Sequence, residues 1–309
     1  LPSGCHMSLE GVARDRVLQS LKSAVPRGLN GMVNEIRSMR QSGEPISLAN
    51  FLSHSGLDLE DVYSHGRSWS DVLEFAQEPL EHSGLYETAL RQACCRLLHL
   101  DDLARLEDYI DWLAKPAPPK TNQLENTKAR QLRMLLSVMT TSIPQMKLLT
   151  TDEAAMVFWT HAQVRTELIE LFGLLKERIQ HLGYVMSEKS TIPLRVHARY
   201  SRLEIQAAFG DSAMGVEEHA VTQVPSWREG VKFMHKEKFD VFLITLNKTE
   251  KRFSPTTRYR DYAISRSLFH WESQSRISAN SPTGLRYQNH QVQGFQVMVF
   301  VRIDAEDRA

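Results

Sequence analysis

The spacing of apolar residues changes once along this chain, near residue 190. Before that point, apolar side chains recur every three or four residues, which is typical of amphipathic helices. Beyond it, apolar and polar residues alternate over short runs such as 194–200 and 268–274, which is typical of β-strands. We therefore predict an α+β protein with a helical N-terminal half and a C-terminal domain built from a curled β-sheet or barrel.

Capping residues set the expected helix boundaries in the first half. Ser47 can cap one helix, Ser68 followed three residues later by Asp71 predicts a second start, and Asp101 is the expected cap of a third helix. The proline-rich segment 115–120 then ends this series, because proline removes a backbone donor and restricts the residue before it. We expect a linker or a domain corner there.

The clearest helical pattern starts at Thr150. Glu153 completes a capping box with Thr150, and apolar residues then repeat at helical spacing as far as Gly183. We expect one long amphipathic helix that packs on the core.

These patterns divide the chain into four segments. Residues 1–7 end in His-Met and follow no structural pattern, so we interpret them as a cloning scar. Residues 8–118 are expected to form a helical domain, 119–189 a helical extension with the long helix, and 190–309 a β-rich domain. The continuous apolar run 297–301 predicts a strand that is buried on both faces.

Composition argues against a membrane protein and against a secreted one. Hydrophobic residues make up 42% of the chain, but no stretch approaches the roughly 20 consecutive apolar residues of a membrane-spanning helix. The three cysteines, Cys5, Cys94 and Cys95, lack the spacing of a metal site or of a disulfide framework. We expect a cytoplasmic protein without a membrane partner.

The net charge of zero conceals two opposite halves. From residue 191 onward the chain has 17 Lys and Arg against 13 Asp and Glu, so the preceding part carries an acidic excess. In residues 248–290, eight Lys and Arg stand against three Asp and Glu, with aromatic and hydroxyl side chains between them. Cations and hydroxyls bind phosphates, and aromatic rings stack on unpaired bases. The segment is a candidate nucleic-acid surface, with a solvated basic loop around core aromatics as the alternative.

The common catalytic motifs are absent from the sequence. It contains no P-loop, no G-x-G-x-x-G, no H-E-x-x-H and no nucleophile elbow. His270 and Glu272 lie on one face of an expected strand and could form a nuclease site with His290, but the rest of a ligand set is missing. We therefore expect this chain not to be an enzyme, and we keep a cryptic nuclease as an alternative.

Four strings in the basic half resemble the C-terminal region of a bacterial enzyme family. They are VFLITLNK (241–248), KRFSPTTRYRDYAIS (251–265), LFHWESQS (268–275) and SPTG-x-RY (281–287). The family comprises the SauUSI-like type IV restriction enzymes, in which a phospholipase-D-type nuclease and a DEAD/DEAH-type helicase motor precede this region. The resemblance extends over residues 194–303, and the helical half resembles the segment that follows the motor.

The resemblance implies a target-recognition module for DNA that carries 5-methylcytosine or 5-hydroxymethylcytosine. It implies an SRA-like fold that flips the modified base out of the duplex. The expected partners are double-stranded DNA with modified cytosine and the helicase and nuclease domains of the same polypeptide. The parent enzyme would use ATP and a divalent metal, and this fragment would need no cofactor.

A flipped cytosine requires stacking rings, an acceptor for its amino group and an apolar notch for its methyl group. We assign the acceptor to Asp261, for which a salt bridge to Arg258 or Arg266 is the alternative interpretation. The candidate pocket residues are Tyr259, Asp261, Tyr262, Phe269 and Trp271. The candidate DNA contacts are Arg199, Lys248, Lys251, Arg252, Thr256, Thr257, Arg258, Arg260, Arg266, Ser273, Gln274, Ser275, Arg276 and Arg286.

A third function remains open besides modified-base recognition and cleavage. The helical half could dock a motor or a second subunit while the basic half binds any DNA. Equal affinity for modified and unmodified duplexes at matched salt would favour this coupling function.

Overall fold

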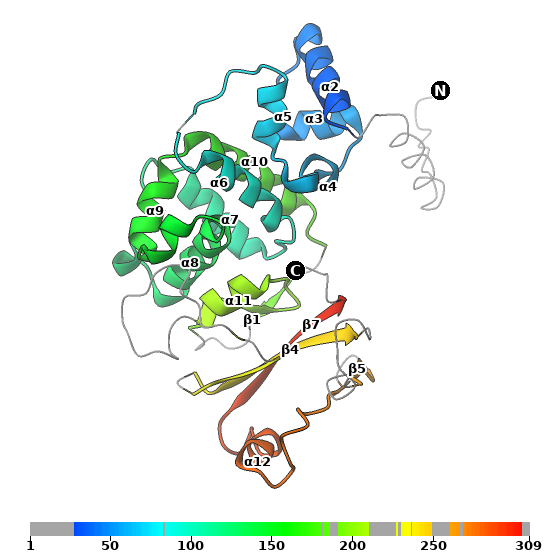
Figure 1. Ribbon diagram of the computed structural model, residues 1–309, viewed down its shortest axis with the longest axis vertical. Coiled ribbons are helices and arrows are strands. Elements are labelled where there is room, and N and C mark those ends of the chain that lie inside the picture. Colours follow the sequence, from blue (N-terminus) through cyan, green and yellow to red (C-terminus); the bar gives the residue numbers. More distant parts are fainter. Residues whose placement is uncertain are drawn as a thin grey trace, which may run out of the picture. The chain divides into compact units, whose positions relative to one another are not determined.

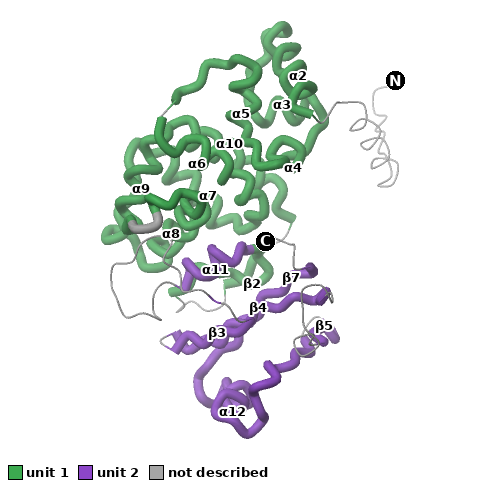
Figure 2. Tube along the Cα trace, in the orientation of Figure 1, with its two compact units in different colours: residues 1–199, 220–222 green, residues 200–219, 223–309 purple. Residues whose placement is uncertain are grey.

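The chain forms two units, in both of which helices and strands occur. The computed structural model describes residues 28–82, 84–180, 182–185, 191–209, 227, 230–235, 237–248, 260–265 and 268–304. Unit 1 comprises residues 1–199 and 220–222, and unit 2 comprises residues 200–219 and 223–309 (Figure 2). The elements in Figure 1 confirm the predicted α+β class. None of the described helices is long and apolar enough to cross a membrane.

Unit 1 is a layered set of helices with one short two-stranded sheet. Its α-helices are α2 (Leu29–Ser42), α3 (Leu48–Ser55), α4 (Leu59–Val62), α5 (Trp69–Phe75), α6 (Glu87–Cys94), α7 (Leu103–Leu113), α8 (Asn126–Thr140), α9 (Thr151–Trp159) and α10 (Ala162–Glu177). Short 3-10 helices are η1 (Ser64–Gly66), η2 (Cys95–Leu97), η3 (Thr121–Gln123) and η4 (Pro144–Leu148). Strand β1 (Tyr184–Val185) pairs antiparallel with β2 (Arg195–Val196).

Most of the predicted helix starts are confirmed. The hydroxyl of Ser47 accepts a hydrogen bond from a backbone N–H in the first turn of α3. Ser68 forms a capping box at the start of α5, and Thr150 forms one at the start of α9. The predicted cap of α7 at Asp101 is wrong by one residue, because Asp102 accepts from the N–H three positions further on. A side-chain cap replaces a missing intrahelical bond and requires only local geometry, so sequence identifies it well.

The helix expected from Thr150 to Gly183 is two helices, α9 and α10. The chain leaves helical geometry at His161, whose φ and ψ are −93° and 76°. The imidazole of His161 is buried, with Nε2 2.7 Å from the carbonyl oxygen of Leu85 and Nδ1 3.1 Å from that of Val157. This contact with a residue 76 positions away is not visible in the local apolar pattern.

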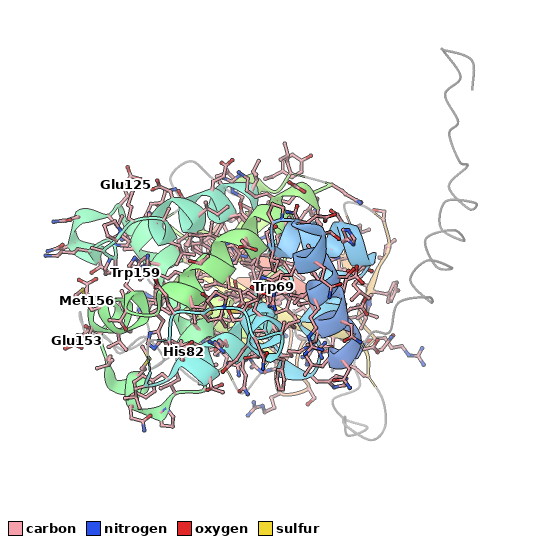
Figure 3. All side chains as sticks on the ribbon, turned by 90° about the horizontal axis from the view of Figure 1, so that it is seen from above. Trp69, His82, Glu125, Glu153, Met156 and Trp159 are labelled. Carbon is pink, nitrogen blue, oxygen red and sulfur yellow. The ribbon has the colours of Figure 1, made fainter. Side chains whose placement is uncertain are left out.

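Helix α10 lies at the centre of unit 1 and packs against α3, α5, α6 and α7. Aromatic side chains fill the space between these helices: the rings of Tyr109 and Phe172 lie 5.7 Å apart, and those of Phe51 and Trp69 lie 4.9 Å apart. Trp69 lies inside the unit, whereas Met156 on α9 points outward (Figure 3). Burial of these rings is the main favourable contribution to folding here.

Two carboxylates of α10 cap other helices. One oxygen of Glu167 accepts the backbone N–H of Trp69 at 2.9 Å, and the other accepts that of Ser70 at 2.9 Å, at the start of α5. Glu170, one turn later, accepts the N–H of Leu48 at 2.7 Å at the start of α3. Burial raises the pKa of both carboxyl groups. A single helix therefore supplies acceptors to the N-terminal ends of two others.

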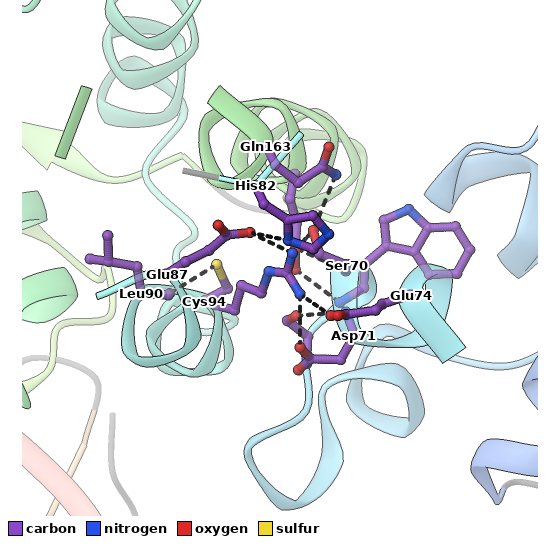
Figure 4. A network of polar contacts seen from close by, with 12 residues as sticks. Ser70, Asp71, Glu74, His82, Glu87, Leu90, Cys94 and Gln163 are labelled. Carbon is purple, nitrogen blue, oxygen red and sulfur yellow. Dashed lines mark hydrogen bonds and ion pairs between the residues drawn. The ribbon is translucent and has the colours of Figure 1, made fainter. Parts of the chain in front are cut away.

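A buried arginine joins α5 to α6. The guanidinium of Arg91 contacts the carboxylates of Glu74 and Glu87, and it lies 3.5 Å from that of Asp71. The arginine side chain is only 5% exposed. Figure 4 shows the carboxylates of Asp71, Glu74 and Glu87 with their polar contacts as dashed lines. The cation is well compensated, so its burial is tolerated.

Unit 2 is organised by strand β4 (Phe239–Asn247), whose residues are buried over most of its length. Strand β3 (Val231–Met234) pairs antiparallel with β4, and β7 (Gln296–Asp304) pairs parallel with it in the order β3-β4-β7. A separate antiparallel pair consists of β5 (Tyr262–Ala263) and β6 (Phe269–His270). Helices α11 (Arg202–Phe209) and α12 (Pro282–Gln288) complete the described part of the unit.

The expectation of a barrel and of a doubly buried last strand is wrong for the described residues. None of the described sheets closes on itself, and β7 pairs with no described strand other than β4. Val299, Val301 and Ile303, which share one face of β7, are 43%, 46% and 61% exposed. An apolar run signals burial on both faces only when other elements cover both, and here the neighbouring β4 occupies that central position.

The string SPTG forms the start of α12. The hydroxyl of Ser281 accepts the N–H of Gly284 at 3.1 Å, and Pro282 occupies the first turn, where its missing N–H costs nothing. A Cβ on Gly284 would lie 2.2 Å from the carbonyl oxygen of Ser278. Glycine is required there by the close approach of the preceding loop.

Candidate nucleic-acid interface

The region with the predicted site residues is built around the β5–β6 hairpin. Tyr262 pairs with His270 and Ala263 with Phe269 across the two strands. Side chains of successive strand residues point to opposite faces, so this register places Tyr262 and His270 on one face and Phe269 on the other. The predicted pocket residues that the structure describes therefore do not line a common face of the hairpin.

Asp261 anchors the base of this hairpin. One carboxylate oxygen accepts the backbone N–H of Glu272 at 3.0 Å, and the other forms an ion pair with Nζ of Lys248. The two side chains are 3% and 9% exposed. The alternative of a salt bridge is thus realised with Lys248, a predicted DNA contact that follows directly on β4. Arg258 and Arg266, the partners considered from sequence, lie outside the described residues.

Trp271 contributes to packing within unit 2. Its ring stacks on that of Phe242 in β4, with centroids 4.1 Å apart and planes inclined by 23°. The ring of Tyr287 in α12 meets Trp271 edge-on at 5.4 Å. This cluster holds the chain after β6 and helix α12 to the central strand, and it occupies one ring face of Trp271.

Arg286 is part of a second ion pair at the other end of β4. Its Nε and one terminal nitrogen each donate to a different oxygen of Asp240 at 2.8 Å. The guanidinium also lies 3.8 Å from the ring centroid of Phe233. The hydrogen bond to Asp240, whose side chain is fully buried, raises the pKa of Arg286. The bidentate pair with a buried acceptor gives this predicted phosphate contact an internal structural role.

Other predicted DNA contacts are distributed over both units. Arg260 and Arg276 are exposed in unit 2, and Ser275 is exposed beside Arg276. Ser273 and Gln274 are half-buried, and the carbonyl oxygen of Gln274 accepts a turn hydrogen bond. The predicted residues Lys251, Arg252, Thr256, Thr257, Arg258, Tyr259 and Arg266 lie outside the described residues.

Arg199 belongs to unit 1 rather than to the unit of the hairpin. Its backbone N–H donates to the carboxylate of Asp101 at 2.7 Å, and its Nε lies 3.7 Å from the same carboxylate. Asp101 therefore fixes this loop instead of capping α7.

The histidines considered for a nuclease site make hydrogen bonds with main-chain carbonyl groups. Nδ1 of His270 lies 2.9 Å from the carbonyl oxygen of Arg260, and Nδ1 of His290 lies 2.9 Å from that of Tyr287. In the part of the chain that the structure describes, no group of three His, Cys, Asp or Glu residues could hold a metal ion.

One face of the hairpin combines Tyr262 and His270 with two exposed residues, Ile264 and Leu268, that the sequence argument did not select. The ring of Tyr262 stacks on that of His270, with centroids 4.7 Å apart and planes inclined by 12°. Tyr262 is 50% exposed, and Ile264 and Leu268 beside it are 55% and 56% exposed. The alternation of these positions around a short loop is the sequence signal that could have identified them.

Comparison with known families gives one match. Residues 194–309 match the family described as Domain of unknown function (DUF3427). No curated protein matches the chain, and no solved structure matches it. The matched segment includes the hairpin, α12 and all of the described β4 and β7.

Proposed function

We propose that the C-terminal part of this chain recognises modified cytosine in duplex DNA and that the chain itself cleaves no bond. The observation that carries the proposal is the half-exposed ring of Tyr262, which stacks on His270 and lies two residues after the exposed Arg260. A flat exposed ring beside a cation suits a base and its phosphate. The resemblance of the same segment to the SauUSI-like target-recognition region supports this choice of ligand.

In this proposal the helicase and nuclease domains of a longer polypeptide supply the motor and the cutting activity. ATP and a divalent metal serve those domains, in the cytoplasm, and the present chain binds DNA without a cofactor. The basic excess of residues 248–290 supplies phosphate contacts.

A second candidate is a coupling module that binds any duplex. It is favoured by one observation: Asp261 and Trp271, two of the residues assigned to the base pocket, are engaged with Lys248 and Phe242 inside unit 2. A pocket built from these side chains would have to give up contacts that hold the hairpin.

Binding measurements on the full chain separate the two candidates. Fluorescence anisotropy with duplexes that differ only in 5-methylcytosine, 5-hydroxymethylcytosine or cytosine should show tighter binding of a modified duplex at every salt concentration. Affinity for each duplex should fall as salt rises, because phosphate contacts release counterions. Equal affinity for all three duplexes would establish the coupling module instead.

Cleavage is tested in the same samples with magnesium or manganese added. We expect intact DNA. Cutting that disappears in His270→Ala would show that the cryptic nuclease is the correct function.

A further inference from the structure

Four side chains form one open face on the β5–β6 hairpin. Tyr262 and His270 are a cross-strand pair, and the N–H of Ile264 donates to the carbonyl oxygen of Leu268 at 2.9 Å, which makes the next pair. Because side chains alternate between faces along a strand, both pairs lie on the same side. We name this set, Tyr262, Ile264, Leu268 and His270, the hairpin face.

The hairpin face projects from a firmly held base. Asp261 ties the start of β5 to Lys248 and to the backbone of Glu272, and His270 is fixed by the carbonyl oxygen of Arg260. On the tip side, the carbonyl oxygen of Leu268 accepts from both Ile264 and Ser265. A short protrusion that is hydrogen-bonded at both ends presents its side chains with little loss of freedom on binding.

The chemistry of the hairpin face matches the interior of a base stack. Two branched aliphatic side chains, each more than half exposed, form the pair next to a flat ring that is itself half exposed. Exposed apolar area of this kind is unfavourable in water and becomes favourable once it is covered. Aliphatic side chains act as wedges between base pairs in DNA-bending proteins, and aromatic rings stack on the exposed bases.

Charge decides between a nucleic acid and an apolar protein surface as the partner. The hairpin lies within the segment of eight Lys and Arg against three Asp and Glu, and Arg260 at its base is exposed. Exposed charge of this sign attracts phosphates, so a nucleic acid suits the hairpin face better than an apolar protein surface does.

We propose that the hairpin enters the duplex as a wedge. Ile264 and Leu268 fill the gap that a displaced nucleotide leaves, and Tyr262 stacks on a base at the edge of that gap. The proposal rests on the proposed function in taking duplex DNA as the ligand, and it assigns Tyr262 to the wedge instead of to the wall of a pocket. Selection of the modified base is then a separate task of other residues.

The test uses the full chain and a duplex in which 2-aminopurine stands beside the modified cytosine. Binding by the unaltered chain should brighten 2-aminopurine, because the wedge removes its stacked neighbour. The double variant Ile264→Ser, Leu268→Ser should lose the brightening and bind roughly tenfold more weakly, since covered aliphatic area is lost. Val292→Ser is the matched control, because Val292 is an apolar residue of the same unit that is 90% exposed.

Tyr262 is tested by two substitutions of different size. Tyr262→Ala should weaken binding about 5- to 150-fold, the range that base–aromatic stacking spans, whereas Tyr262→Phe should retain the affinity of the unaltered chain. Circular dichroism and thermal unfolding of each variant show whether the fold is kept. If Tyr262→Ala does not fold, the double serine variant and Tyr262→Phe still decide the outcome.

The outcomes separate the wedge from the proposed function. A chain that prefers modified DNA but keeps its brightening and affinity in all hairpin variants has another intruding element, and the wedge is overturned while the function stands. A chain without preference whose brightening depends on the hairpin confirms the wedge and overturns the recognition of modified cytosine. A chain that binds no duplex overturns both.

Discussion

The two units place charged side chains in different structural roles. In unit 1, two carboxylates of α10 accept from the first N–H groups of α3 and α5, and Arg91 balances three carboxylates between α5 and α6. In unit 2, two ion pairs stand at the two ends of β4 and hold α12 and the hairpin. Charge in unit 1 joins helices to one another, and charge in unit 2 attaches a helix and a hairpin to one strand.

This difference changes the interpretation of the basic segment. Lys248 and Arg286 contribute to its positive charge in the sequence, but each is paired with a carboxylate in the structure. Arg260 and Arg276 remain exposed among the described cations of the segment, and the hairpin face adds exposed apolar and aromatic side chains. A cation that is counted from the sequence is available to phosphate only if the fold gives it no nearer anion.

The largest expected effect is on the arginine network of unit 1. Arg91→Met should lower the free energy of unfolding by about 3–5 kcal/mol, because it leaves the buried carboxylate of Glu87 without its cation. Urea unfolding with hydrogen exchange read peptide by peptide should show the loss in α5 and α6. A change below about 1 kcal/mol would mean that the carboxylates are solvated and that the network is not a structural element.

The next effect concerns the capping carboxylate of α10. Glu167→Ala should cost about 2–4 kcal/mol, because the buried N–H groups of Trp69 and Ser70 lose their acceptor. The measurement is again urea unfolding of the full chain, with exchange at the first turn of α5 as the local readout. Unchanged protection of these amides would contradict the cap.

The same carboxyl group predicts a pH dependence. Burial raises the pKa of Glu167 in the folded state, so its stabilising contribution is fully present below the unfolded pKa and is lost as the pH rises through the folded pKa. The unaltered chain should therefore lose stability relative to Glu167→Gln as the pH is raised over this window. A stability difference that is flat or rises with pH would contradict the shift.

A smaller effect is expected at the start of β4. Asp240→Asn should cost about 1.5–3 kcal/mol, because the bidentate bonds from Arg286 lose their charged acceptor. Hydrogen exchange should increase in β4 and α12 while unit 1 keeps its protection. Equal loosening of both units would show that they do not unfold separately.

The smallest effect is expected for an exposed ion pair of unit 1. Arg178 and Glu60 lie 2.7 Å apart, with side chains 40% and 61% exposed. Arg178→Met should change the unfolding free energy by about 0–1 kcal/mol, because water already screens both charges. A cost as large as that of Arg91→Met would remove the distinction between buried and surface charge on which the comparison rests.

The sequence by itself determined the features that depend on neighbouring residues. Ser47, Ser68 and Thr150 were identified as helix caps because a cap and its N–H partner lie two or three positions apart. The change in apolar period gave the α+β class, because the two periods follow from backbone geometry.

Only the tertiary structure decided which side chains meet across long separations. His161, where the expected long helix is interrupted, contacts the carbonyl oxygen of Leu85. Strand β7 lies beside β4, which takes the central position in the described sheet. Asp261 forms its ion pair with Lys248. None of these partners is set by local spacing. Burial and ion pairing depend on how distant segments pack. A sequence pattern indicates which residues can be buried or paired, but it does not identify the elements that cover them or the residues that pair with them.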